Sequence, residues 1–202
     1  DQAYDESNHA RNVANFLGTD HHEIVVKPDP ELILRKIGQV LDQPFGWNAW
    51  QAEDLVADIK LITDAELQAH VQTIFDRAIS KSLPKVREFA HQLIHNDAND
   101  NNVVVAAGKV TGLIDFGDLI LAPRVCGLAV GCAYQLDARD PVASIYSVVR
   151  GYHEVAPLSP AELEVLFDLV CLRVATSVVM AHRQLAADPD NEYLAISQDY
   201  FR

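Results

Sequence analysis

The hydrophobic and polar positions between residues 92 and 118 predict the centre of the fold. Two β-branched runs, 103–105 and 110–114, are separated by Ala-Gly-Lys at 107–109, a combination typical of a tight turn. This pattern predicts an antiparallel hairpin, and an apolar stretch at 92–94 predicts a short strand before it. Because antiparallel pairing brings the start of one strand next to the end of the other, the polar segments flanking the hairpin are expected to lie side by side.

Elsewhere the apolar residues recur at helical spacing. Capping-box patterns at Thr63–Glu66 and Ser159–Glu162 are expected to open two of the helices. Residues 121–123 are expected to close the loop that follows Asp118. The predicted fold is mostly α with a small β-hairpin, an α+β fold. Helices are expected at 51–62, 63–79, 125–136, 141–152 and 163–185, and a helix-strand-helix segment at 1–46.

The loops flanking the hairpin carry the candidate chemistry. Asn102 and Asp115 offer hard oxygen ligands of the kind that hold magnesium on the phosphates of a nucleotide. Asp97 is placed to accept a proton from an attacking hydroxyl. This division of labour is that of kinase-type phosphoryl transfer. His95 is the other catalytic candidate, and bracing the loop is its favoured role. The alternative is that these carboxylates and amides only form hydrogen bonds to the backbone of the turns and have no catalytic role.

These residues form an ordered motif. His95-x-Asp97-x-x-x-x-Asn102, read with IDFGD at 114–118, resembles the catalytic and metal loops of the aminoglycoside phosphotransferase and choline kinase superfamily. The sequence HNDANDNNVVV, together with GLIDFGD, is similar to that of hydroxylysine kinase and of phosphotransferase domains fused to class III aminotransferases. The likeness runs from about residue 50 to 202.

The resemblance implies a protein-kinase-like large lobe over 47–202, acting with ATP and Mg²⁺. It implies Asp97 as the base, with His95 as the other catalytic candidate on the same loop, and Asn102 and Asp115 as the residues that bind the cofactor and the metal. The acceptor would be the hydroxyl of a small molecule, an amino alcohol or an aminoglycoside. Arg173 could face a phosphate or a substrate carboxylate, or simply be exposed or paired internally, and Asp118 could bind a substrate amine or cap a loop.

The first 46 residues have a different sequence pattern. YDESxxARxVAxxLGTxHHEIVV, followed by a helix and LDQPFG, resembles a fragment of the synthetase domain of glutamine-hydrolysing asparagine synthetase. The SGGxDS loop that holds the ATP pyrophosphate in that family does not occur in this sequence. An adenylating ligase is therefore disfavoured, and no site residue is transferred from that family.

A kinase-type enzyme also needs a small lobe, with a glycine-rich phosphate cover and a lysine on the phosphates. Neither feature is found in the sequence, so the small lobe is expected to be missing. One hypothesis is a phosphotransferase in which residues 1–46 or a second subunit replace that lobe. The alternative is a catalytically silent remnant or interaction module that self-associates through the apolar face left bare, as a homo-oligomer.

The charge and composition of the chain limit the classes of partner that it is expected to bind. The formal charge of −13 disfavours nucleic acid or an anionic membrane and would attract a cationic substrate. No apolar stretch reaches membrane-spanning length and the start is unlike a signal peptide, so a cytoplasmic location is expected. The three cysteines lie in apolar contexts without CxxC spacing and are expected to be buried free thiols, at Cys126, Cys132 and Cys171.

Overall fold

The computed structural model describes residues 11, 15, 16, 18 and 49–187. The chain divides into two compact units, residues 1–39 and 40–202, and all the elements described below belong to the second. The segment predicted at 1–46 lies outside the described residues apart from four positions, and its assignment as a separate domain stays a prediction. The elements are η2 (Ala49–Leu61), α3 (Ala65–Arg77), η3 (Ala78–Ser82), α4 (Leu83–Val86), β1 (His91–Ile94), β2 (Val103–Ala106), β3 (Lys109–Leu113), η4 (Phe116–Asp118), β4 (Ile120–Pro123), α5 (Arg124–Tyr134), α6 (Pro141–Val155) and α7 (Pro160–Ala187).

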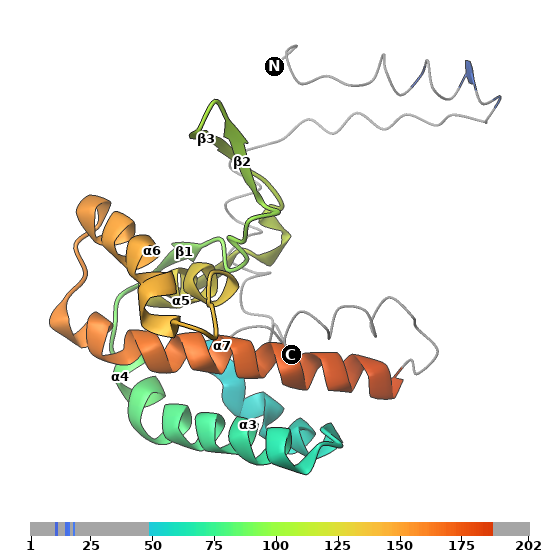
Figure 1. The fold of residues 1–202 in the computed structure, drawn as a ribbon, viewed down its shortest axis with the longest axis vertical. Helices are drawn as coiled ribbons and strands as arrows, with labels where there is room; N and C mark the ends of the chain where they lie inside the picture. Colours follow the sequence, from blue (N-terminus) through green and yellow to red (C-terminus); the bar gives the residue numbers. More distant parts are fainter. Residues whose placement is uncertain (1–10, 12–14, 17, 19–48, 188–202) are drawn as a thin grey trace. The chain divides into compact units, whose positions relative to one another are not determined.

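The helices predicted at 63–79, 125–136, 141–152 and 163–185 are confirmed, and α7 is their centre. It runs the length of the helical layer, with α3 on one side and α5 on the other (Figure 1). The segment predicted as a helix at 51–62 is a 3-10 helix, η2, which also packs on α7. Apolar side chains of these helices form one continuous core. No helix in the described part of the chain combines the length and apolarity needed to cross a membrane.

Of the two predicted capping boxes, one is present as predicted and the other differs in the structure. At α7 the reciprocal bonds are present: the Glu162 carboxylate accepts from the Ser159 N–H at 2.8 Å, and the Ser159 hydroxyl accepts from the Glu162 N–H at 3.2 Å. At α3 the cap is one residue later than predicted. The Asp64 carboxylate accepts the backbone N–H groups of residues 66 and 67, both at 2.9 Å, so Asp64 and not Thr63 begins the helix.

The sheet structure is larger than predicted, because residues 120–123 are a strand and not a loop closure. This strand, β4, pairs antiparallel with β1, with Leu93 opposite Leu121. The predicted hairpin is confirmed as β2 and β3, with Val103 opposite Leu113. Its two-residue turn has positive φ at Ala107 (50°) and at Gly108 (73°), which is the geometry that matches the twist of paired strands. The fold is mostly helical with two small antiparallel sheets.

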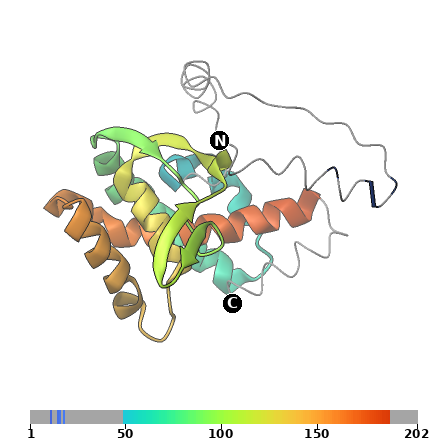
Figure 2. The same ribbon diagram turned by 90° about the horizontal axis from the view of Figure 1, so that it is seen from above.

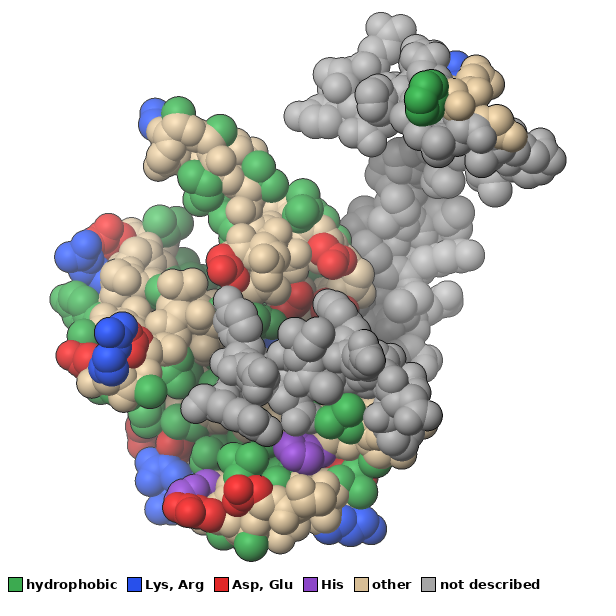
Figure 3. All heavy atoms as spheres, turned by 45° about the vertical axis from the view of Figure 1, so that its right-hand side comes forward, with side chains coloured by type: hydrophobic (Ala, Val, Ile, Leu, Met, Phe, Trp, Pro, Cys, Tyr) green, Lys and Arg blue, Asp and Glu red, His purple; other side chains and the backbone are tan. Residues whose placement is uncertain are grey.

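The hairpin stands away from the helices and carries an apolar surface. Figures 1 and 2 show it rising from the layer formed by α5 and α7, joined to it by the loops that precede β2 and follow β3. In Figure 3 hydrophobic side chains run along the hairpin, and acidic side chains gather at its base. The most exposed apolar side chains of the hairpin are those of Val110 (71%) and Val105 (59%), and Phe116, in η4 just after the hairpin, is 54% exposed.

Candidate functional site

Asp97 is the centre of the loop between β1 and β2. Asn102 donates to it twice, once to its main-chain oxygen at 2.8 Å and once to its carboxylate Oδ2 at 2.9 Å. Asn102 is buried (8% exposed), so this five-residue span of loop is fixed by side-chain as well as backbone bonds. The structure thus brings together two of the residues that the sequence singled out.

Asn99 tightens the same loop from within. Its amide nitrogen donates to Asp97 Oδ2 at 3.0 Å. Its amide oxygen accepts from the backbone N–H of Asn101 at 2.8 Å and of Asn102 at 3.2 Å. Asn99 therefore satisfies turn backbone, as expected for an asparagine in such a loop, and also orients the candidate base.

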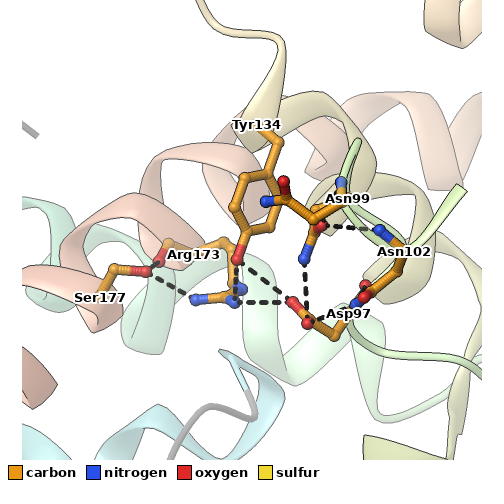
Figure 4. Close-up of polar contacts among 7 residues, drawn as sticks. Asp97, Asn99, Asn102, Tyr134, Arg173 and Ser177 are labelled. Carbon is orange, nitrogen blue, oxygen red and sulfur yellow. Dashed lines mark hydrogen bonds and ion pairs between the residues drawn. The ribbon is translucent and has the colours of Figure 1, made fainter. Parts of the chain in front are cut away.

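Tyr134 and Arg173 reach Asp97 from two helices, as Figure 4 shows. The Tyr134 hydroxyl, at the end of α5, donates to Asp97 Oδ1 at 3.2 Å. Arg173, on α7, places Nη2 3.8 Å from the same oxygen and 3.5 Å from the Tyr134 hydroxyl, and donates through Nη1 to the Ser177 hydroxyl at 2.6 Å. Internal pairing, one of the alternatives considered for Arg173, is thus observed, whereas Tyr134 was not singled out from the sequence.

Burial shapes the chemistry of this contact. The Arg173 side chain is 5% exposed and that of Asp97 is 22% exposed. Burial raises the pKa of Tyr134, with Arg173 opposing the rise and Asp97 adding to it. The phenol is therefore kept protonated, in the form that can donate to Asp97.

His95 points to the second loop. Its Nε2 donates to the main-chain oxygen of Ile114 at 2.9 Å, and its ring lies 5.0 Å from that of Phe116, centroid to centroid. These contacts join the loop before β2 to the loop after β3, which is the geometry of a brace. The next residue, Asn96, is buried with a left-handed φ of 62°, so the backbone turns sharply just before Asp97.

Asp115 lies on the neighbouring loop. The preceding residue, Ile114, donates its N–H to the main-chain oxygen of Asn102 at 3.0 Å, which brings the two polar loops together as the hairpin predicts. Asp115 has a left-handed φ of 59° and is exposed. A Cβ built on Gly117 would lie 3.4 Å from Asp115 Oδ1, so the two residues are close in this turn. The structure therefore brings Asp115 beside the Asp97 loop without a direct side-chain contact to Asn102.

Asp118 is a third carboxylate, and it interacts electrostatically with Asp97 and Asp115. Its pKa is raised first by burial and then by the charges of Asp97 and Asp115, while Arg173 and His95 oppose the rise. Beyond the effect of burial, the negative charges of Asp97 and Asp115 therefore disfavour ionisation of Asp118. A bound cation would oppose that effect.

The donor set fits magnesium. Both amide hydrogens of Asn102 are directed to Asp97, which leaves its side-chain oxygen for a cation, and the exposed Asp115 supplies a carboxylate. Magnesium is commonly held by one or two carboxylates and by substrate phosphates. Within residues 49–187 and the four described positions before them, no three His, Cys, Asp or Glu side chains are grouped to hold a metal. The roles of these residues stay predictions.

A cavity of about 400 Å³ opens beside the loop. It lies between β1, the Asp97 loop, α5 and α6, and is lined among others by His95, Asn96, Gly131 and Tyr152. It is large enough for a small organic molecule.

Known proteins share sequence with this chain. The sequence matches the phosphotransferase enzyme family over residues 10–164, a span that begins inside the segment compared above with asparagine synthetase. Hydroxylysine kinase of Xenopus laevis is 29% identical over 165 residues, covering 76% of this chain and 44% of the relative. Hydroxylysine kinase of Mus musculus is 27% identical over 164 residues, with the same coverage, and that of Bos taurus is 30% identical over 143 residues, covering 65% of this chain and 37% of the relative.

The chain spans less than half the length of these curated relatives. No solved structure gives a significant match to it. The family match nevertheless covers well over half of the chain, including both polar loops and the hairpin between them. The chain therefore belongs to the phosphotransferase enzyme family.

Proposed function

We propose that this chain takes part in ATP- and Mg²⁺-dependent transfer of a phosphoryl group to the hydroxyl of a small molecule. The observation that carries the proposal is the fixed Asp97 carboxylate, bonded to Asn102 at 2.9 Å, beside the loop that presents Asp115. In the transfer, the hydroxyl oxygen forms a bond to the γ-phosphorus and the bond to the β-phosphate oxygen breaks. Asp97 takes the hydroxyl proton, and ADP leaves.

Asn102 and Asp115 are proposed to hold the metal. Magnesium, when bound, would neutralise charge on the phosphates as the transfer proceeds. Asn102 would then have two tasks, since its amide hydrogens fix Asp97 and its amide oxygen would be a ligand for the ion. His95 supports both loops through Ile114 and Phe116, so we assign it to positioning, although it was a catalytic candidate.

The acceptor is proposed to be a small hydroxyl compound that carries an amine. The relatives are named hydroxylysine kinases, and a hydroxylated amino acid is a member of that class. The formal charge of −13 favours the approach of a cation, and the cluster of Asp97, Asp115 and Asp118 provides the local field. An amino alcohol or an aminoglycoside fits the same argument.

A second candidate, an interaction module that self-associates, rests on the exposed hairpin. Val105 and Val110 are 59% and 71% exposed, and the neighbouring Phe116 is 54% exposed. Exposed apolar patches of this kind commonly mark contact surfaces. Sedimentation velocity over a concentration series tests it. A dimer that dissociates when Val110 is changed to Lys supports self-association, and a monomer at every concentration counts against it.

The catalytic proposal is tested by following ADP formation from ATP and Mg²⁺ with hydroxylysine, ethanolamine and an aminoglycoside in turn. Asp97→Asn should abolish turnover. The matched control is Asp100→Asn, which removes the same charge from an exposed position of the same loop and should leave the rate within twofold. Calorimetry with Mg²⁺ and ATP should show binding that is lost in Asp115→Ala. Turnover that survives in Asp97→Asn would refute the assignment of the base.

A further inference from the structure

The Asp97 carboxylate is held asymmetrically. Oδ2 accepts from the amides of Asn99 and Asn102, at 3.0 and 2.9 Å, so both of its lone-pair directions are in use. Oδ1 accepts from the Tyr134 hydroxyl at 3.2 Å, and the Arg173 guanidinium is 3.8 Å away. Of the two oxygens, Oδ1 therefore keeps capacity for another hydrogen within the described part of the chain.

Arg173 is an unusual residue for its place. It is 4% exposed on a helix whose neighbouring positions, Leu169 and Leu172, are fully buried apolar side chains. Burying a guanidinium among such residues costs free energy unless the charge is compensated. Its observed partners, Asp97, Tyr134 and Ser177, supply hydrogen bonds and a counter-charge and direct the cation at the candidate base.

The contacts form a chain that ends on one oxygen atom. Ser177 fixes Nη1 of Arg173, Nη2 of Arg173 faces the Tyr134 hydroxyl, and the hydroxyl donates to Oδ1 of Asp97, as Figure 4 shows. Tyr134 ends α5 and Arg173 lies within α7. Two core helices thus control the rotation of a carboxylate that belongs to a loop.

We infer that Tyr134 and Arg173 are positioning residues that orient Asp97 so that Oδ1 receives the proton of the acceptor hydroxyl. The inference rests on the proposed function, since it assigns the atom that acts as the base. Neither residue touches substrate in this assignment. Loss of either residue removes a contact to Oδ1 while Asn99 and Asn102 still hold Oδ2, so the carboxylate is oriented less well, which slows the proton-transfer step and does not weaken substrate binding.

The first test is a steady-state comparison of Tyr134→Phe and Arg173→Met with the wild-type chain. Loss of one hydrogen bond to the base should lower kcat about 10-fold in Tyr134→Phe, with KM for ATP and for the acceptor unchanged within twofold. Arg173→Met should lower kcat further, and added guanidinium ion at millimolar concentration should restore part of the rate in Arg173→Gly. A merely structural role would not give this split between kcat and KM.

The matched control is a second tyrosine–arginine pair. Arg150 lies 6.0 Å from the ring centroid of Tyr146 on α6, and both residues are exposed. Tyr146→Phe and Arg150→Met make the same chemical changes away from Asp97 and should leave kcat within twofold. An equal loss of kcat in the control variants, or wild-type kcat in Tyr134→Phe, would overturn the inference.

A second readout does not depend on turnover. The side-chain amide signals of Asn99 and Asn102, observed by ¹H–¹⁵N NMR, report on the carboxylate to which both donate. They should move in Tyr134→Phe and stay in place in Tyr146→Phe. If the wild-type chain shows no phosphoryl transfer, the proposed function fails, and this measurement alone decides the positioning: shifted signals support it and unshifted signals refute it.

Discussion

Asn102 gives both hydrogens of its side-chain amide to Asp97, at 2.8 Å to the main chain and at 2.9 Å to the carboxylate. In Asn102→Asp, oxygen would replace the donor group and two carboxylates would face each other. We expect the free energy of unfolding to fall by roughly 2–4 kcal/mol at pH 7, because two bonds are lost and a repulsion is added. Urea denaturation measures it.

The control for this variant is Asn101→Asp, which introduces the same charge at the exposed neighbouring position. Its cost should stay below about 0.5 kcal/mol. Equal losses in the two variants would mean that added charge on the loop, and not the bonds to Asp97, sets the stability.

Glu162 predicts an acid-dependent loss of stability. The Arg124 guanidinium donates to it at 2.7 and 2.9 Å and lowers the pKa of this carboxyl from its usual 4.5 to about 2. Because the pKa is lowered on folding, the contribution is complete above about pH 4.5 and is lost as the pH falls towards 2. It amounts to roughly 2–3 kcal/mol. The unfolding free energies of wild type and Glu162→Gln should converge over this range.

Glu164 provides the comparison for that pH series. It pairs with Lys85 at 2.6 Å, but its side chain is 62% exposed, so solvent screens the pair. Glu164→Gln should change stability by less than about 1 kcal/mol. A constant difference between wild type and Glu162→Gln over the same interval would contradict the assignment to Arg124.

Two glycines should respond oppositely to the same substitution. Gly127 lies inside α5, and a Cβ there would be 3.5 Å from the Cβ of Ile94, an ordinary contact. Gly127→Ala should stabilise the protein by about 0.5–1 kcal/mol through helix propensity. Gly108 has a φ of 73° in the hairpin turn, so Gly108→Ala should cost roughly 1–2 kcal/mol. Thermal unfolding measures both, and shifts of the same sign would contradict this account.

Two of the three cysteines, Cys126 and Cys132, should be unreactive in the folded chain. The free thiols expected from the sequence are confirmed, with Cys126 and Cys132 buried and Cys171 half-buried. Burial raises the pKa of Cys126 to about 12 and that of Cys132 to about 11. At pH 8, iodoacetamide should label Cys171 first and the other two only when urea unfolds the protein. Mass spectrometry of the peptides distinguishes the sites, and early labelling of Cys126 would show that α5 opens.

Local features of the structure could be predicted from the sequence. The hairpin was predictable because Gly108 favours the turn and β-branched residues flank it. The strand at 120–123 was missed because it ends in proline and exists through its pairing with β1, some thirty residues earlier, which no local pattern encodes. The helix cap moved from Thr63 to Asp64 because both side chains can cap, and packing decides between them.

In the candidate site, too, local sequence patterns predict some residues and miss those that depend on packing. Asp97, Asn102 and Asp115 carry a recognisable spacing, whereas Tyr134 is an ordinary residue at the end of an apolar helix. Arg173 had a usable signal, since a lone cation within the apolar run of α7 needs a partner if it is buried. The sequence could not name that partner, because the contact depends on how α7 packs against the loop.

The peptide groups on either side of Ile114 are tied to the Asp97 loop. The Ile114 N–H donates to the oxygen of Asn102, and its carbonyl accepts from His95. The two loops separate only when both bonds open, so they should form one cooperative unit in native-state hydrogen exchange. The amides of Asn102 and Ile114 should exchange at matching rates, and a ligand that stabilises either loop should slow exchange in both.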